Sequence, residues 1–248
     1  MNIIKLDERN IYRDSIYKYL DADFSQYMLS QYITSDNLNS DTLIKFMSEN
    51  DIDLTPVMPD IKNSSTGVIF FLKEKILDIV IPSFEVTENF VHTSYDLGPL
   101  KNIFNQPRIV GVILLRLGRF ALAVLDDEKI VASKTEGRYV KNRHKAGGSS
   151  QRRFERSRER LIREFYDKSC EQVEKVFEEH IENIDHIFLG GEAHTLNGFK
   201  KRCSFINKYD QKVMTRILDI NIPNQKTINS IARQVYSSKL ITYELIQD

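Results

Sequence analysis

The sequence lacks several features that would each point to a particular class of protein. Its 248 residues include no tryptophan and only two cysteines, and its 35 basic and 35 acidic residues leave no net charge. No run of about 18 apolar residues occurs, so a transmembrane helix and a membrane partner are not expected. The first residues, MNIIKLDERN, have no basic segment followed by an apolar stretch, which argues against a secretory signal. With 41% hydrophobic residues the chain can bury a core, and we expect a cytoplasmic protein.

The two cysteines, Cys170 and Cys203, are too few for a disulfide framework, and no metal-ligand spacing surrounds them. Cys170 lies on the apolar side of a predicted helix, so we expect buried thiols rather than a disulfide. The histidines outside the basic segment form no H-x-x-x-H pattern and are interpreted as structural: His92, His180, His186 and His194. The sequence therefore predicts no metal site and no cofactor.

What the sequence does contain is one strongly basic segment. From Arg138 to Arg163 there are ten cations and two acids, a local net charge of +8 in a chain that is neutral as a whole. A neutral protein that gathers its positive charge on one small element presents that element to a polyanion.

Within this segment a flexible stretch, residues 146–150 (AGGSS), precedes a predicted helix from about Ser150 to His180. Arginines in the first turns oppose the helix dipole, at a cost of about 0.3–1 kcal/mol each. Arg152, Arg156 and Arg160 share one face, and Phe154, Leu161 and Phe165 share the opposite, apolar face. This pattern favours a phosphate-binding helix docked to its own domain. The alternative is a solvated face with Glu159–Arg163 and Glu164–Lys168 pairs.

The amino-terminal part differs in composition. Residues 1–60 are acidic, and Tyr12, Ile16, Tyr17 and Leu20 recur at helical spacing, so we expect a small helical appendage over residues 1–62. Prolines and an NSSTG stretch at 63–67 predict the boundary to a second domain over 67–248.

The second domain is expected to hold a mixed sheet. A hairpin is predicted from 67–72 and 76–82, followed by three strands at 109–117, 120–125 and 129–135. After the long helix come strands at 186–189 and 213–220 and helices at 195–205 and 227–237. Three meandering strands followed by crossover helices predict an RNase H-like α/β fold, a mixed five-stranded sheet flanked by helices.

The first of these strands contains no acid, and Arg116 is its only charged residue. Nucleases of this fold place a metal-binding acid in the middle of that strand, so a two-metal nuclease is not expected. Gly190-Gly191 follows a strand without completing G-x-G-x-x-G, and we interpret it as a tight turn rather than a phosphate cradle.

The motif RYVKNRHKAGGSSQRRFER, from Arg138 to Arg156, leads into the long helix directly after the third strand of the meander. It resembles the middle domain of archaeal and eukaryotic peptide-release factors, and more closely the Vms-type release-factor-like proteins. The resemblance covers roughly residues 108–240. It implies a protein that acts on peptidyl-tRNA in ribosome-associated quality control.

In release factors a Gly-Gly-Gln loop enters the peptidyl-transferase centre, and the glutamine positions a water against the ester between peptide and tRNA. Here Gly147-Gly148 is followed by two serines. Either Ser149 replaces the glutamine, or Ser149, Ser150 and Gln151 match the Gly-Ser-Gln variant of the Vms-type proteins. We favour Gln151, because a serine substitutes poorly for an amide that must reach a water.

The resemblance therefore implies a metal-independent peptidyl-tRNA hydrolase with a catalytic loop formed by Gly147, Gly148, Ser149, Ser150 and Gln151. The expected partners are peptidyl-tRNA, the rRNA of the large ribosomal subunit and other quality-control factors. Two alternatives are an endonuclease that cleaves tRNA near its CCA end and a non-catalytic ribosome- or RNA-binding factor. The residues expected to contact RNA are Arg138, Lys141, Arg143, His144, Lys145, Arg152, Arg153, Arg156 and Arg160.

Overall fold

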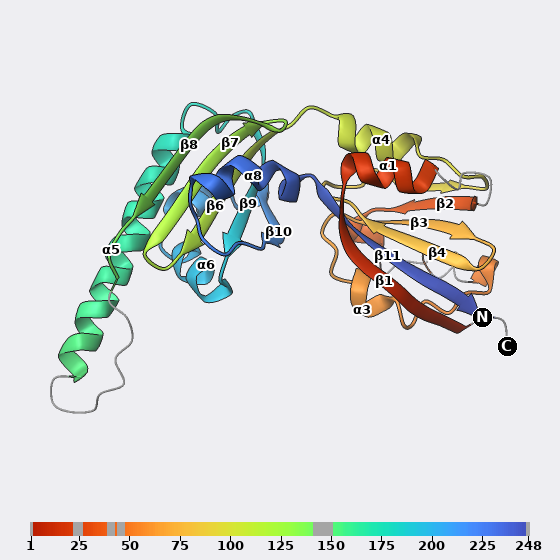
Figure 1. Cartoon of the computed structure of the whole chain (residues 1–248), viewed down its shortest axis with the longest axis horizontal. Helices are drawn as coiled ribbons and strands as arrows, with labels where there is room; N and C mark the ends of the chain where they lie inside the picture. The colour runs from red at the N-terminus through yellow and green to blue at the C-terminus, as the bar shows by residue number, and fades with distance from the viewer. Residues whose placement is uncertain (1, 22–26, 39–42, 44–47, 141–150, 247–248) are drawn as a thin grey trace. The chain divides into compact units, whose positions relative to one another are not determined.

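The computed structural model describes all of the chain except residues 1, 22–26, 39–42, 44–47, 141–150 and 247–248 (Figure 1). The chain forms two compact units. Unit 1 combines Met1–Gln106 with Tyr236–Asp248, and unit 2 is the single segment Pro107–Val235. No helix among the described residues is long and apolar enough to cross a membrane.

Unit 1 is built on a six-stranded sheet with the strand order β1-β11-β4-β3-β2-β5. All five strand pairs are antiparallel. The predicted hairpin at 67–82 is present as β3 and β4. The strands are β1 (Asn2–Tyr12), β2 (Tyr27–Ile33), β3 (Val68–Lys73), β4 (Ile76–Ile81), β5 (Phe90–His92) and β11 (Ser237–Ile246). The helices include α1 (Arg13–Asp21), α3 (Met58–Ile61) and α4 (Gly98–Asn105), with a 3-10 turn at Ser35–Asn37.

The expectation of a helical appendage over residues 1–62 is wrong. Helix α1 covers only Arg13–Asp21, and the residues before it form β1, which pairs from Asn2 to Tyr12 with β11. The partner strand lies more than 200 residues further along the chain, so no local pattern could reveal the pairing. The expected boundary at 63–67 falls inside unit 1, since β3 and β4 beyond it join the same sheet.

Polar contacts also attach β11 to the amino-terminal part of unit 1. The Tyr243 hydroxyl donates to Asp60 of α3 at 2.6 Å, and Lys5 of β1 contacts the same carboxylate at 2.9 Å. Lys239 contacts Glu8 of β1 at 2.6 Å. The last strand of the chain is therefore fixed to both its neighbouring strand and α3.

Unit 2 contains a five-stranded sheet with the order β10-β9-β6-β7-β8. The first three strands along the chain form an antiparallel meander, β9 runs parallel to β6, and β10 runs parallel to β9. This topology confirms the predicted RNase H-like mixed sheet. The strands are β6 (Ile109–Arg116), β7 (Arg119–Asp126), β8 (Lys129–Gly137), β9 (Ile184–Gly191) and β10 (Val213–Leu218), and the helices are α5 (Gln151–Phe177), α6 (Ala193–Lys200), α7 (Ser204–Lys208) and α8 (Gln225–Val235), with a 3-10 turn at Asp210–Lys212.

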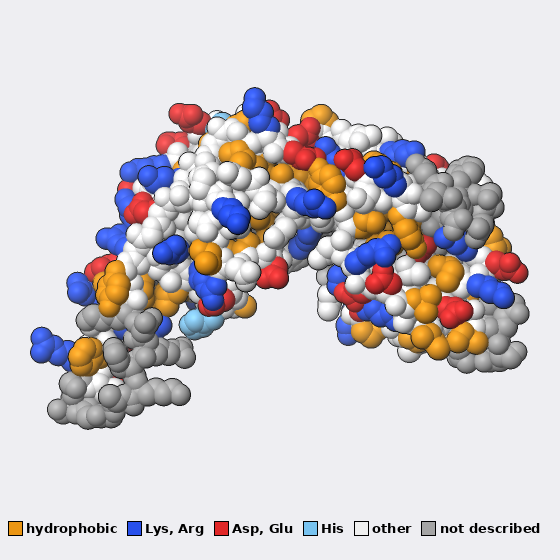
Figure 2. All heavy atoms as spheres, viewed as in Figure 1, with side chains coloured by type: hydrophobic (Ala, Val, Ile, Leu, Met, Phe, Trp, Pro, Cys, Tyr) orange, Lys and Arg blue, Asp and Glu red, His pale blue; other side chains and the backbone are white. Residues whose placement is uncertain are grey.

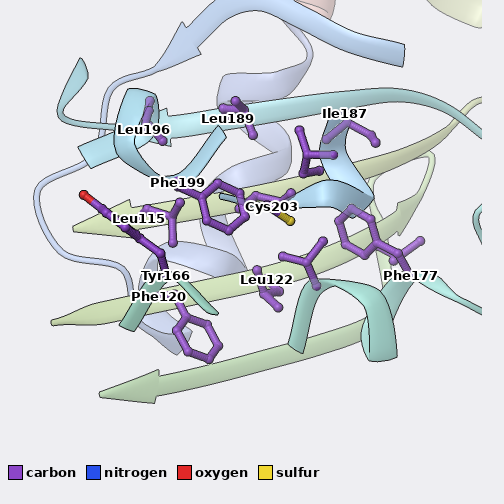
Figure 3. Close-up of a cluster of buried hydrophobic side chains, with 14 of the residues drawn as sticks. Leu115, Phe120, Leu122, Tyr166, Phe177, Ile187, Leu189, Leu196, Phe199 and Cys203 are labelled. Atoms are coloured by element: carbon purple, nitrogen blue, oxygen red, sulfur yellow. The ribbon is translucent and has the colours of Figure 1, made fainter. Parts of the chain in front are cut away.

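The central strand β6 is buried on both faces, as its apolar run predicts. Ile113 and Leu115 join the core formed with α5, α6 and α7, shown in Figure 3. Val112 and Leu114 point to the opposite face and are also fully buried, and α8 contacts β7 and β8. The sheet therefore holds the carboxyl-terminal half of α5 rigidly on one face.

The expectation of two free thiols is wrong. Cys170 of α5 and Cys203, the N-cap of α7, form a disulfide with a Cα–Cα distance of 5.2 Å. They are 33 residues apart and meet only because α5 and α7 pack on the same face of the sheet. The disulfide ties α5 to the layer of short helices beside it.

Candidate functional site

Helix α5 divides into an anchored half and a projecting half. Its 27 residues make a rod about 40 Å long. From Phe165 onward, side chains such as Val173 and Phe177 are fully buried in the core, whereas no side chain from Gln151 to Glu164 is buried. Even Phe154, expected on the apolar face, is 49% exposed, because the helix has passed beyond the sheet at that point. We call residues 151–164 the projecting arm (Figure 1).

The two halves of α5 also differ in how their charges are paired. In the anchored half Glu171 contacts Lys168 at 3.0 Å and Lys175 at 2.7 Å. Hydrogen bonds from Lys175 and Lys168 lower the pKa of the Glu171 carboxyl to about 2. Lysine charges there are matched by a carboxylate.

On the projecting arm the arginines outnumber the acids, and the first turn contains no acid at all. Arg160 contacts Glu164 at 3.3 Å. Within the described part of the chain, no carboxylate pairs with Arg152, Arg153, Arg156 or Arg163. Figure 2 shows blue side chains following the outer flank of α5 at the left of the view. Exposed, unneutralised cations at the wrong end of the helix dipole make this arm strongly electropositive.

Gln151 is the first residue of α5, and its side chain is exposed. Its Nε2 atom donates to Glu155 Oε1 at 2.9 Å, one turn further along the helix. This contact occupies the donor end of the amide and leaves the carbonyl oxygen Oε1 without a partner among the described residues. The free oxygen is the atom that could accept a hydrogen bond from water.

The remaining predicted site residues divide between described and undescribed positions. Arg138 is exposed at the root of the basic loop, where its backbone N–H donates to Gly118 O at 2.7 Å. The exposed side chains of Arg152, Arg153, Arg156 and Arg160 all lie on the projecting arm. The other predicted residues lie outside the described residues: Lys141, Arg143, His144, Lys145, Gly147, Gly148, Ser149 and Ser150.

Gly190 and Gly191 are the last two residues of β9, and they pair closely with Leu114 and Leu115 of β6. A Cβ on Gly191, whose φ is +125°, would lie 2.0 Å from Leu115 O, and one on Gly190 would lie 2.7 Å from a Leu114 methyl carbon. Both glycines are required by packing rather than by a ligand. In the described part of the chain, no three His, Cys, Asp or Glu side chains are grouped as metal ligands would be.

Two cations near the loop were missed in the sequence. Arg116 and Arg119 flank the tight turn between β6 and β7 and lie at the same end of the sheet as Arg138. Their positions on either side of Leu117-Gly118 could have predicted this arrangement, because a two-residue hairpin turn places the flanking side chains opposite each other.

An RNase H-like sheet whose third strand leads through a cationic Gly-Gly segment into a projecting arginine-rich helix defines a release-factor-like protein. The family model of the Actinobacteria/chloroflexi VLRF1 release factor matches residues 108–240, more than half of the chain. The chain belongs to this family of Vms-type release-factor-like proteins.

Curated relatives point to the same class. "Peptide chain release factor subunit 1" of Methanopyrus kandleri is 28% identical over 151 residues, which is 60% of this chain and 36% of the relative. The protein of the same name from Picrophilus torridus is 24% identical over 232 residues, 88% of this chain and 56% of the relative. The chain thus spans only about a third to a half of the length of these relatives.

Solved structures resemble the chain more loosely. An archaeal translation termination factor, aRF1, has a TM-score of 0.41 at 13% identity, covering 91% of this chain and 73% of its own. The Vms1 mitochondrial localization core has a TM-score of 0.39 at 14% identity, covering 69% and 74%. Neither score reaches 0.5, so the family assignment rests on the sequence matches.

Proposed function

We propose that this protein hydrolyses the ester of peptidyl-tRNA held on the large ribosomal subunit, and so frees stalled nascent peptides in translation quality control. The observation that carries the proposal is the placement of Gln151. It begins a projecting arm rich in arginines, directly after the GGSS stretch, in a member of a release-factor family. A cytoplasmic location follows from that substrate.

The chemistry needs no nucleophile from the protein. Gly147 and Gly148 allow the backbone to approach RNA closely, and the Gln151 amide oxygen orients a water toward the ester carbon. The contact between Gln151 Nε2 and Glu155 supports this orientation in the free protein. Positioning of this kind is commonly worth about 100-fold or more in rate.

The arginines of the arm supply affinity rather than chemistry. Arg152, Arg153 and Arg156 are exposed on its first turns and would contact phosphates of the rRNA or of the tRNA acceptor end. The undescribed cations of the loop would add to this contact. Such binding is independent of RNA sequence and brings the loop to its substrate.

Gln151→Ala tests the proposal directly. The variant should release peptide from large-subunit-bound peptidyl-tRNA at least about 100-fold more slowly, with unchanged affinity for the subunit, because every cation is retained. The measurement is single-turnover release of a labelled peptide, together with a binding assay. Full release by the variant would rule out Gln151 as the residue that positions the water. A wild-type protein that binds subunits without releasing peptide would leave the binding-factor alternative.

Two further measurements separate the remaining alternatives. Ser149→Ala should retain most activity if Gln151 is the working residue. If Ser149 occupies the glutamine position instead, Ser149→Ala should lose activity and Gln151→Ala should retain it. Sequencing the 3′ end of the released tRNA identifies the reaction, since ester hydrolysis leaves an intact CCA end and endonuclease cleavage removes it.

A further inference from the structure

Three arginines lie at the same end of three adjacent strands in unit 2. Arg116 ends β6, Arg119 begins β7, and Arg138 directly follows the last residue of β8. The strand register pairs Arg116 with Arg119, and pairs Arg119 with Gly137. We call these three residues the arginine edge.

The cross-strand pair is unfavourable within the protein alone. Two like charges directly opposite each other in an antiparallel pair destabilise a hairpin. Arg116 is held by the Asn221 carbonyl and lies 3.6 Å from Glu192. Arg119 is exposed, and none of the described carboxylates forms an ion pair with it. One member of the pair is therefore neutralised and the other is left for an external anion.

Arg119 also lines a hollow of about 300 Å³ that is open to solvent, together with Thr135, Glu136, Gly137, Pro223 and Asn224. The Asn224 Oδ1 atom accepts from the Thr227 backbone N–H at 2.9 Å, which leaves the amide Nδ2 as a donor. A guanidinium, an amide and the Thr135 hydroxyl can all donate to phosphate oxygens. Glu136 is the only acid among the lining residues.

We propose that this hollow binds an RNA backbone phosphate through Arg119, as a second RNA contact apart from the projecting arm. It rests on the proposed function, in which the protein works on ribosome-bound tRNA. The chain leaves β8 at Gly137 and enters the cationic loop one residue later, so a polyanion that follows the loop to its root reaches this edge. Unit 2 as a whole has 25 basic and 17 acidic residues, which favours RNA over a basic protein partner.

The test compares Arg119→Ala with Lys129→Ala. Lys129 is exposed at the opposite end of β8, so its removal takes the same charge from the same unit. The probes are deacylated tRNA and purified large ribosomal subunits, titrated between about 50 and 200 mM salt. Arg119→Ala should bind about three- to tenfold more weakly and lower the slope of log K against log salt by about 0.7–0.9, the value for one lost phosphate contact. Lys129→Ala should keep the wild-type slope.

A third variant and a comparison of the two probes extend the test. Glu136→Gln should bind more tightly, because it removes the one acid from the hollow. A defect with both probes assigns the phosphate to tRNA, and a defect with subunits alone assigns it to rRNA. Thermal melting confirms that the variants fold, and Arg119→Gln replaces the alanine variant if that one does not. Equal slopes for Arg119→Ala, Lys129→Ala and the wild type with both probes would overturn the proposal.

The phosphate site at Arg119 and the proposed hydrolase can be disproved independently of each other. If Gln151→Ala releases peptide as fast as the wild type does, the catalytic role of Gln151 is disproved while the slope measured for Arg119→Ala stands by itself. If Gln151→Ala is inactive and Arg119→Ala binds as the wild type does, only the phosphate site is lost.

Discussion

At the scale of single residues, Glu8 of β1 connects both ends of the chain. Hydrogen bonds from Lys239 of β11 and from Lys5 lower the pKa of its carboxyl below 4.5. A group whose pKa is lower in the folded state contributes stability above its unfolded pKa and loses it as the pH falls through the folded value. The contribution of Glu8 is therefore present at neutral pH and disappears below about pH 4.5.

We expect Glu8→Gln to lower the free energy of unfolding at pH 7 by no more than about 1 kcal/mol, because solvent screens the exposed pairs. Between about pH 5 and pH 3 the variant should lose less stability than the wild type does. Urea denaturation at a series of pH values measures both effects. The control is Glu74→Gln, which alters an exposed glutamate in the β3–β4 turn and should follow the wild-type profile; identical profiles for all three proteins would contradict the role of Glu8.

Some residue roles could be read from the sequence and others could not. The exposure of Arg152, Arg153 and Arg156 on α5 agrees with the sequence pattern, since cations that oppose a helix dipole need an external reason, and their role in binding RNA stays a prediction. The Cys170–Cys203 disulfide was not, because 33 residues separate the two thiols and only the packing of α5 and α7 brings them together. The pairing of Arg116 with Arg119 required the hairpin register, which sequence spacing alone left open.

At the scale of elements, substitutions in the projecting arm should weaken binding to large subunits without lowering the free energy of unfolding. Removing Arg152 and Arg156 should leave the free energy of unfolding unchanged or raise it by up to about 1 kcal/mol, since both oppose the helix dipole and neither is buried. Affinity for large subunits should fall, and the salt slope should decrease by about 1.4–1.8 for two phosphates. Lys175→Ala is the matched control, because its charge pairs with Glu171 at the anchored end. Reduced stability without a change in slope would contradict this division of α5.

At the anchored end of the same helix, the Cys170–Cys203 disulfide should stabilise unit 2. Closing a loop of 33 residues is worth about 3–4 kcal/mol in the chain-entropy description. Replacing Cys170 and Cys203 together by alanine should lower the stability of unit 2 by about 2–4 kcal/mol, as should reduction of the wild type. Calorimetry with and without reductant measures this, and a reductant effect that persists in the double variant would show that the disulfide is not its cause.

The elements themselves were predictable where their patterns are local. The run IVGVILLRL predicted the central strand β6, and the amphipathic pattern after the glycines predicted α5 to within a few residues. Strands β1 and β11 were missed because they pair with each other although they lie at opposite ends of the sequence. Charges in the middle of β1, next to a register shift between Lys5 and Asp7, also interrupt its alternation of apolar and polar residues.

At the scale of the whole molecule, charge is divided between the units. Unit 1 has 10 basic and 18 acidic residues and unit 2 has 25 and 17, so a neutral chain consists of parts with charges of −8 and +8. An acidic unit is repelled by RNA phosphates, and a basic unit is attracted to them. Affinity for RNA is therefore expected to reside in unit 2.

This division predicts that residues 107–235 fold and bind RNA without unit 1. All five strands of the RNase H-like sheet, the helices that cover it and both cysteines come from this one segment. Unit 1, in contrast, needs β11 from the end of the chain between β1 and β4. A fragment 107–235 should melt cooperatively and bind large subunits at least as tightly as the full chain, since the acidic unit is gone. A chain ending at Val235 should lose the ordered sheet of unit 1 and keep that of unit 2, which hydrogen exchange can follow strand by strand. Loss of protection in β6, β7 and β9 of either protein would show that unit 2 depends on unit 1 for its fold.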